Sequence, residues 1–472
     1  MRRRSMMRLE SALEHIHVTS DKTEVYPDPQ KATTSPKYKI EFQSNSTLVV
    51  TIHFLKALLS PAILAIPSGF RSGGLIFSIF GFLFLVCVVS FNVKKLLDSA
   101  TYLSIREDVV VRTYDQLAFV SFQTCSSRTK PLARYIKVLV NVLVIVTYLD
   151  ACSIFMIFMA RNAQALINFY FPYMSVSVAI HHYLFLQVIF LMVMSSIRNL
   201  KYLSPFSFIS CVLLLVVVAL TTYFYFLVNI PSVWDRKQIG TILSIPRLTS
   251  IVSFSLSGVS ISLTLKSSML HPEHFLGFPG VYCFSMVVFS VTGIVFGYLG
   301  YLKFGNETKP SILLNLPVDE KLAISIKVAA MFSTFFASPL IFYVAFNVLW
   351  NNYLKTFVNP VNVIFAEFLG RYTFITVSFI MACALPDLGT MIVLKGALLH
   401  SHLEITIPAV VEYVAYYPSV GNGKYGFRLI RTLSICLLGI FLSISGTTVA
   451  IMDFIREGIT CLSDVLRSLR SW

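Results

Sequence analysis

Apolar residues in this chain fall into long blocks that short polar segments separate, about eleven in number. Most blocks approach the ~20 residues that an α-helix needs to cross the ~30 Å hydrocarbon core of a bilayer. The pattern predicts an all-α membrane protein with about eleven transmembrane helices. The predicted spans are residues 48–67, 74–97, 135–159, 179–197, 203–227, 248–269, 279–302, 323–349, 370–385, 390–415 and 427–451.

Two of these blocks are interrupted at their centres by small or helix-breaking residues. The first span breaks at Ser60–Ala62, where a proline removes a backbone N–H, and the sixth breaks at Ser257–Ser260. Unwound backbone at membrane depth needs a partner from protein, water or ligand. Interrupted helices at matching positions of two halves indicate the binding site of a secondary transporter. A simple proline kink at the first break and close helix packing at the second are the alternatives.

Composition supports the membrane assignment and narrows the function. Hydrophobic residues are 56% of the chain and charged residues 13%, which excludes a soluble domain. The net charge of +15 is interpreted as topology bias, so no nucleic-acid partner is expected. No catalytic triad, phosphate-binding loop or metal-ligand spacing stands out. We therefore expect a non-enzymatic protein without cofactor or metal, whose immediate partner is the lipid bilayer.

The distribution of Lys and Arg predicts the topology. With the N-terminus in the cytoplasm, the inner segments hold about twice as many Lys and Arg residues as the outer segments. Asn306 begins an Asn-Glu-Thr glycosylation sequon in an outer loop, in agreement with this orientation. We predict a mostly disordered cytoplasmic tail at 1–47, a transmembrane domain at 48–452 and a short C-terminal tail at 453–472. In the inner loop at 98–134, Thr113–Ala118 predicts an interfacial helix.

Charged residues within the spans are costly in a bilayer and are therefore functional candidates. His53 and Lys56 lie on the first span, Asp150 on the third and Lys266 near the inner end of the sixth. We expect Asp150 to face a cavity or to pair with Lys56, Lys266 or His53. The two lysines alternatively extend towards an interface, where their ammonium groups reach water.

Five separated stretches resemble the amino acid/auxin permease family, and within it the animal proton-assisted amino acid transporters. The resemblance covers roughly residues 45–452. Its stretches, in chain order, are His53–Pro67, Ile197–Ser207, Gly300–Pro317, Leu385–Gly389 and Gly396–Leu398.

The resemblance implies the leucine-transporter-like fold, with two inverted repeats of five helices and an eleventh span. It implies that spans 1 and 6 hold an amino acid with help from spans 3 and 8. The substrate carboxylate is expected at the first break and the ammonium at the second. The residues assigned by position are Ser60, Pro61 and Ala62 for the carboxylate, and Ser257, Gly258 and Val259 for the ammonium.

The chain also departs from the family pattern at its coupling residues. The family's glycines at the first break are replaced by Ser60 and Ala62, and Lys266 stands where span 6 usually has an acid. The histidine that the family uses for proton coupling aligns with Lys94, which does not titrate near neutral pH. Asp150 is then either a relocated proton carrier or the counter-charge of a lysine.

The sequence thus predicts a secondary transporter of small neutral amino acids or related zwitterions that works by alternating access. A co-transported proton is an open question. The alternative is an amino-acid-binding membrane sensor or receptor with little transport. The membrane is expected to be the plasma membrane or the lysosomal membrane.

Overall fold

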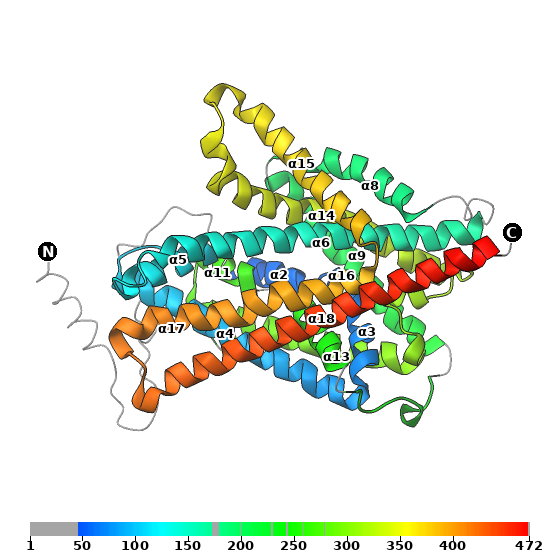
Figure 1. Ribbon diagram of the computed structural model, residues 1–472, viewed down its shortest axis with the longest axis horizontal. Coiled ribbons are helices and arrows are strands. Elements are labelled where there is room, and N and C mark those ends of the chain that lie inside the picture. The colour runs from blue at the N-terminus through cyan, green and yellow to red at the C-terminus, as the bar shows by residue number, and fades with distance from the viewer. Residues whose placement is uncertain are drawn as a thin grey trace, which may run out of the picture.

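Long helices form the regular structure of the chain in a computed structural model, and most of them run side by side (Figure 1). The structure describes residues 46–171, 179–198, 200–227, 230–241, 244–257, 259–277 and 279–470. Nearly all of the tail predicted at 1–47 therefore lies outside the described residues. Within them the all-α prediction is confirmed.

Each predicted span coincides with one helix or with a group of consecutive helices. By length and composition, eight helices of the described residues can cross a membrane. The long helices are α4 (Leu75–Arg106), α6 (Leu132–Tyr170), α9 (Leu200–Leu227), α13 (Val281–Phe304), α14 (Lys321–Asn352), α15 (Val363–Ala384) and α18 (Phe427–Arg470). The eighth candidate is the first span, which comprises α2 (Thr47–Leu58), η3 (Pro61–Ala65) and α3 (Ile66–Gly73).

The other three predicted spans are short or interrupted. The fourth is α8 (Ile180–Ser195), which has 16 residues. The sixth is divided into α10 (Ile245–Ser255) and α11 (Val259–Ser267). The tenth comprises α16 (Leu388–Lys395), the π-helix η10 (Gly396–Thr406) and α17 (Ile407–Val420). Both helix breaks predicted from the sequence, in spans 1 and 6, are thus present.

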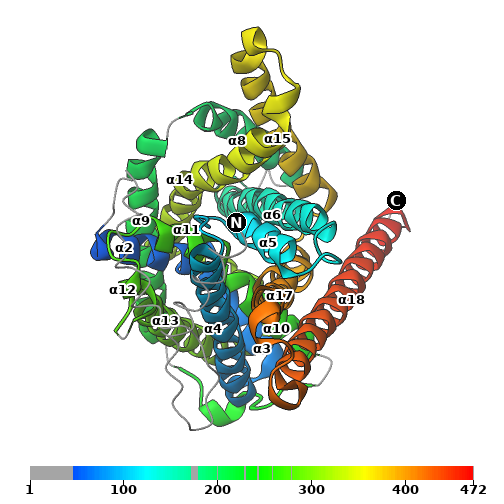
Figure 2. The same ribbon diagram turned by 90° about the vertical axis from the view of Figure 1, so that its left-hand side faces the viewer.

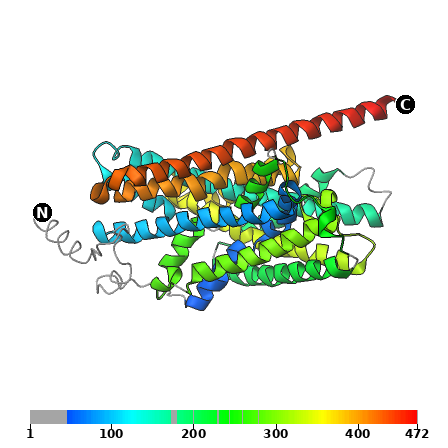
Figure 3. The same ribbon diagram turned by 90° about the horizontal axis from the view of Figure 1, so that it is seen from below.

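Two further helices can be compared with the predicted segments, one in the inner loop and one at the end of the chain. The inner loop contains α5 (Tyr114–Cys125), directly after Thr113, so the helix predicted there is confirmed. The last helix, α18, does not end at 451 but runs on to Arg470. Figure 3 shows its red C-terminal end extending past the neighbouring orange helix α17, and Figure 2 shows α18 along the edge of the bundle.

A row of glycines on α13 lets the broken first span approach closely. A Cβ at Gly297 would lie 2.6 Å from the ring of Phe70, and one at Gly300 would lie 2.8 Å from Pro67. Small residues at helix interfaces replace the hydrophobic driving force that lipid cannot supply. The α13 glycines therefore fix the position of α3, which follows the first break.

Close backbone contacts also hold the interrupted sixth and tenth spans together. A Cβ at Gly396 would lie 1.8 Å from the carbonyl oxygen of Ser250 on α10. On the other side, α18 brings Gly446 against Ser250 and Ala397. The start of the π-helix is thus enclosed between α10 and α18 without room for one more methyl group.

We predict that Gly396→Ala destabilises the protein, because the new methyl group can fit only if the backbone of α10 or η10 moves. Overpacking of this kind costs about 1–3 kcal/mol, so the thermal unfolding midpoint in detergent should fall by several degrees. Gly81→Ala is the control, since its Cβ would meet side-chain atoms alone, the tip of Leu248 at 3.2 Å and the ring of Phe77 at 3.8 Å. Equal midpoints for the two variants would show that the contact at Gly396 is not tight.

Candidate substrate site

The first break begins where α2 ends at Leu58. Ser60 takes an extended conformation and its Oγ accepts a hydrogen bond from the backbone N–H of Ala62 at 3.4 Å. Pro61 opens the 3-10 helix η3, where its missing N–H costs nothing. Because η3 continues into α3, the chain is helical from Pro61 to Gly73 and its N-terminal end lies at the break.

The second break separates the end of α10 from the start of α11. The last helical residue of α10 is Ser255, and Leu256 N–H donates to the carbonyl of Ser253 at 3.1 Å. Gly258 lies outside the described residues, and of Val259 only its place at the start of α11 is described. Ser253 is buried, and its hydroxyl has no hydrogen-bond partner among the described residues.

A buried hydrogen bond joins the two breaks. The hydroxyl of Ser255, at the end of α10, donates to the carbonyl of Ala62 in η3 at 3.4 Å and also to Ile251 at 3.0 Å. A carbonyl of the helical turn that follows the first break thus accepts a hydrogen bond from a side chain at the opposite break. The two interrupted helices meet at this point.

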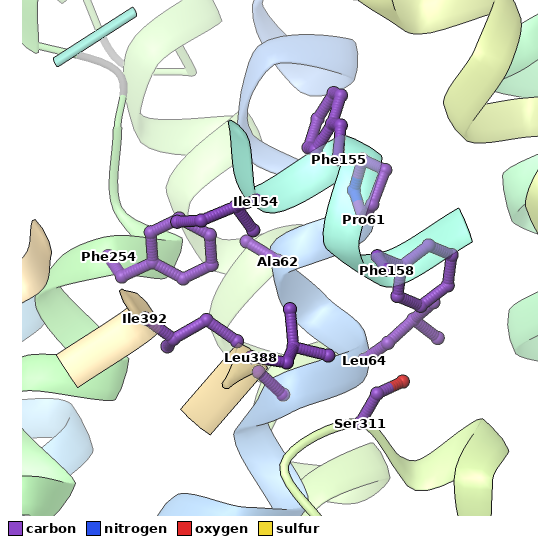
Figure 4. Close-up of a pocket in the computed structure, with 11 residues that line it drawn as sticks. Pro61, Ala62, Leu64, Ile154, Phe155, Phe158, Phe254, Ser311, Leu388 and Ile392 are labelled. Atoms are coloured by element: carbon purple, nitrogen blue, oxygen red, sulfur yellow. The ribbon is translucent and has the colours of Figure 1, made fainter. Parts of the chain in front are cut away.

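A small cavity of about 20 Å³ lies next to this contact (Figure 4). Its walls come from η3, α6, α10 and α16, with one residue from the loop before η7 (Ile312–Asn315). It is lined by Pro61, Ala62, Leu64, Ala65, Ile154, Phe155, Phe158, Phe254, Ser311, Leu388 and Ile392.

The lining sets what the cavity can accept. It is aliphatic and aromatic apart from the hydroxyl of Ser311, which is buried and has no hydrogen-bond partner among the described residues. A charged side chain would find no counter-charge among the lining residues and would lose its hydration. The volume is enough for one water molecule, so a larger ligand could enter only if the walls moved.

A second, wider cavity of about 210 Å³ lies at the end of the bundle where α3 ends and α10 and α16 begin. We call it the vestibule. Five charged side chains line it, among them an ion pair between Arg247 on α10 and Asp453 on α18. The other three are Arg71, Asp387 and Arg456. Ile392 lines both the vestibule and the small cavity, so it separates the two.

The structure brings only some of the predicted substrate residues to the small cavity. Pro61 and Ala62 line it, whereas neither Ser60 nor Ser257 is among the described residues of its lining. Span 6 contributes Phe254 from the turn before the break instead. Span 3 contributes through α6, as the resemblance implied, but the remaining wall comes from span 10 and not from span 8.

The structure places a different partner beside Asp150 from the three that the sequence predicted. Asp150 is buried on α6 and interacts electrostatically with Lys395 at the end of α16. The predicted pairing with Lys56, Lys266 or His53 is wrong, because these residues lie elsewhere on the bundle. The ammonium of Lys266 donates to Thr101 Oγ1 at 2.8 Å and faces Asp98 on α4.

The other predicted charged residues lie away from the cavity. Lys56 is near Cys211 of α9, and its ammonium has no hydrogen-bond partner among the described residues. His53 and Lys94 are exposed on their helix surfaces. Asn306, the predicted glycosylation site, is also exposed, in the short helix η6 (Gly305–Glu307).

Sequence reasoning missed a buried group of ionisable residues on span 10. Lys395, His400 and Glu404 are all buried, and the imidazole Nδ1 of His400 lies 2.8 Å from Glu404 Oε1. A signal for them was present, since His400 and Glu404 are four residues apart and therefore share one helix face. What the sequence did not show was that Asp150 of span 3 lies beside this face.

Comparison with known proteins supports a transport role. Two relatives are a proton-coupled amino acid transporter-like protein, pathetic, of Drosophila melanogaster and the vacuolar amino acid transporter 3 of Saccharomyces cerevisiae. The first is 28% identical over 412 residues, which cover 87% of this chain and 85% of the fly protein. The second is 22% identical over 84% of this chain, and the match spans 55% of the yeast protein.

A third relative and one solved structure extend the comparison. The probable amino acid transporter skat-1 of Caenorhabditis elegans is 22% identical over 67% of this chain and 70% of its own. The structure is that of Mhp1, a nucleobase-cation-symport-1 family transporter, in a closed conformation with bromovinylhydantoin bound. It is 11% identical, with a TM-score of 0.49, and the match covers 88% of this chain and 93% of Mhp1.

The family model described as transmembrane amino acid transporter protein matches residues 43–452, which is most of the chain. The three relatives described above are named as transporters and not as enzymes. The chain is accordingly a multi-pass integral membrane protein, and it belongs to the transmembrane amino acid transporter family.

Proposed function

We propose that this protein is a secondary transporter that moves small neutral amino acids, or related zwitterions, by alternating access around the two helix breaks. The observation that carries the proposal is the meeting of both breaks beside one apolar cavity, where Ser255 donates a hydrogen bond to the Ala62 carbonyl. Unwound backbone supplies both donors and acceptors at membrane depth, which is what the two ends of a zwitterion require.

The two breaks suit opposite ends of the substrate. The helical segment that starts at Pro61 has its positive N-terminal end at the first break, so we assign the carboxylate to Ser60, Pro61 and Ala62. The C-terminal end of α10 presents carbonyl groups at the second break. We assign the ammonium to this end and to the following residues Ser257, Gly258 and Val259.

The cavity lining supports a neutral side chain. Three phenyl rings, from Phe155, Phe158 and Phe254, surround the space beside the breaks. A small aliphatic side chain gains from contact with these rings, whereas a charged one would be desolvated without compensation. The substrate class that fits is therefore the small neutral amino acids.

Access is proposed to come through the vestibule when Ile392 and its helix move. The segment that carries the Asn306 sequon lies beside the vestibule, because Arg71 of the vestibule donates a hydrogen bond to the Thr308 carbonyl at 2.6 Å. With the N-terminus in the cytoplasm and Asn306 glycosylated, the vestibule then faces the extracellular space or the lysosomal lumen. The opposite end of the bundle opens to the cytoplasm in the other half of the cycle.

We predict that the purified protein in proteoliposomes catalyses counterflow of alanine. Vesicles loaded with unlabelled alanine should take up labelled alanine faster than empty vesicles. In loaded vesicles the carrier can cross the membrane in both directions with alanine bound, which is the exchange that counterflow measures. Glycine and proline should compete for this uptake, and lysine and glutamate should not. Binding of labelled alanine without counterflow would contradict transport and would favour the alternative function of an amino acid sensor.

We also predict that Phe155→Ala changes the substrate preference. Removal of this ring enlarges the cavity, so the rate of leucine uptake should rise relative to alanine uptake by about tenfold or more. Phe185→Ala is the matched control, because Phe185 is 61% exposed on α8 and does not line the cavity. An unchanged leucine-to-alanine ratio would place the substrate side chain elsewhere.

A further inference from the structure

Four ionisable side chains gather in the interior of the bundle beside the substrate cavity. They are Asp150 on α6, Lys395 at the end of α16, and His400 and Glu404 on the π-helix η10, and we call them the buried ionic cluster. Each of the four is at most 5% exposed. Charged groups at membrane depth are costly and are kept where they have a function.

The cluster is connected by contact and by charge. The imidazole Nδ1 of His400 lies 2.8 Å from Glu404 Oε1, one helical turn away. The ammonium of Lys395 interacts electrostatically with the carboxylates of both Asp150 and Glu404. Among the described residues, the other titratable groups near the cluster are the thiol of Cys152 on α6 and the hydroxyls of Tyr114 on α5 and Tyr282 on α13. The thiol of Cys436 on α18 donates to the Thr406 carbonyl at the end of η10.

The charges of the cluster do not balance without one more proton. Two carboxylates, Asp150 and Glu404, share the single ammonium of Lys395, which leaves one negative charge while His400 is neutral. A buried charge without a counter-charge is strongly destabilising. Three polar atoms are also left without a hydrogen-bond partner among the described residues: Asp150 Oδ2, Glu404 Oε2 and His400 Nε2. One proton on the His400–Glu404 pair restores neutrality.

Phe254 lies between this cluster and the substrate cavity. One side of its ring lines the cavity (Figure 4). The ammonium of Lys395 lies over the ring at 5.0 Å from its centre, and the His400 ring meets it edge to face at 6.4 Å. Phe254 also directly precedes Ser255, the last residue of α10. A rearrangement of the second break on substrate binding would therefore displace this ring relative to Lys395.

The helix that carries Lys395 also borders the vestibule. Val393 lines the vestibule and is two residues before Lys395 on the same helix. Beyond Lys395 the chain continues as a π-helix of 11 residues, a rare geometry that occurs frequently at functional sites.

We propose that the buried ionic cluster is a proton-binding centre and that Phe254 couples its occupancy to the substrate cavity. This inference rests on the proposed transport function. One proton from the vestibule side binds at His400 Nε2 or Glu404 Oε2, crosses with one amino acid, and is released on the opposite side. The carrier without substrate then returns to its first orientation, and its cluster holds one proton fewer. Coupling is thereby carried by span 10, although Lys94 stands where the resembling family has its histidine.

The proposal predicts that Glu404→Gln separates flux from coupling. Proteoliposomes with an acidic exterior and an alkaline interior should accumulate labelled alanine with the unmodified protein. Glu404→Gln should lower this accumulation by tenfold or more and should retain counterflow at equal pH, because the amide keeps the cluster neutral without a titrating proton. Glu320→Gln, an exposed residue before α14, is the matched control and should behave like the unmodified protein.

Phe254→Leu provides a second test that changes no titratable group. It keeps an apolar wall but removes the ring face that Lys395 contacts, so the proton-driven accumulation of alanine, normalised to the alanine counterflow of the same variant, should fall. A pH-sensitive dye inside the vesicles should report proton entry with alanine for the unmodified protein and a lower proton-to-alanine ratio for Phe254→Leu.

The outcomes distinguish the two proposals. Absence of counterflow in the unmodified protein would overturn the proposed function itself. Counterflow that is present but indifferent to the proton gradient would overturn the proton-binding centre and leave transport standing. Proton-driven accumulation that survives in Glu404→Gln would likewise overturn the centre. Should Glu404→Gln fail to fold, as judged by its gel-filtration profile, unchanged coupling in Phe254→Leu would overturn the link through Phe254.

Discussion

Every backbone group at membrane depth must find a partner inside the protein, and the architecture around the two breaks follows from this constraint. Unwinding at Ser60 and after Ser255 releases carbonyl and amide groups where no water is available. The Ser60 hydroxyl satisfies the Ala62 N–H, and the Ser255 hydroxyl satisfies the Ala62 carbonyl from the other helix. Side chains of the protein thus make these contacts in the structure, and under the proposed function a zwitterionic ligand would make them in an open state.

Close packing holds the breaks in register. Gly297 and Gly300 on α13 admit the rings of Phe70 and Pro67, and Gly396 admits the carbonyl of Ser250. In lipid, where burial of apolar surface between helices brings little gain, such close approaches supply the cohesion. The helices that carry the breaks are thus fixed by glycine contacts on either side, and the apolar cavity is what remains between them.

Much of the fold could be predicted from hydropathy and helix-breaking residues, because these act locally. The long spans, both breaks and the helix after Thr113 follow from the residues at those positions. The site could not be predicted to the same degree, because its walls come from four segments far apart in sequence. In the sequence, Phe254 and Ile392 cannot be told from the other apolar residues of their hydrophobic blocks. Only the tertiary contacts place them at the cavity. The partner of Asp150 was mispredicted for the same reason, since several lysines satisfied the charge argument equally.

The position of the ionisable residues bears on the coupling centre proposed above. The family's histidine position is occupied by Lys94, which is exposed, and Lys266 is engaged with Thr101 away from the cavity. An acid and an imidazole lie on span 10 instead, buried in the π-helix. Electrostatic coupling depends on distance to the moving break and not on the helix that carries the charge. Under this proposal, a centre on span 10 that contacts Phe254 would act on the second break directly, without a group on span 2.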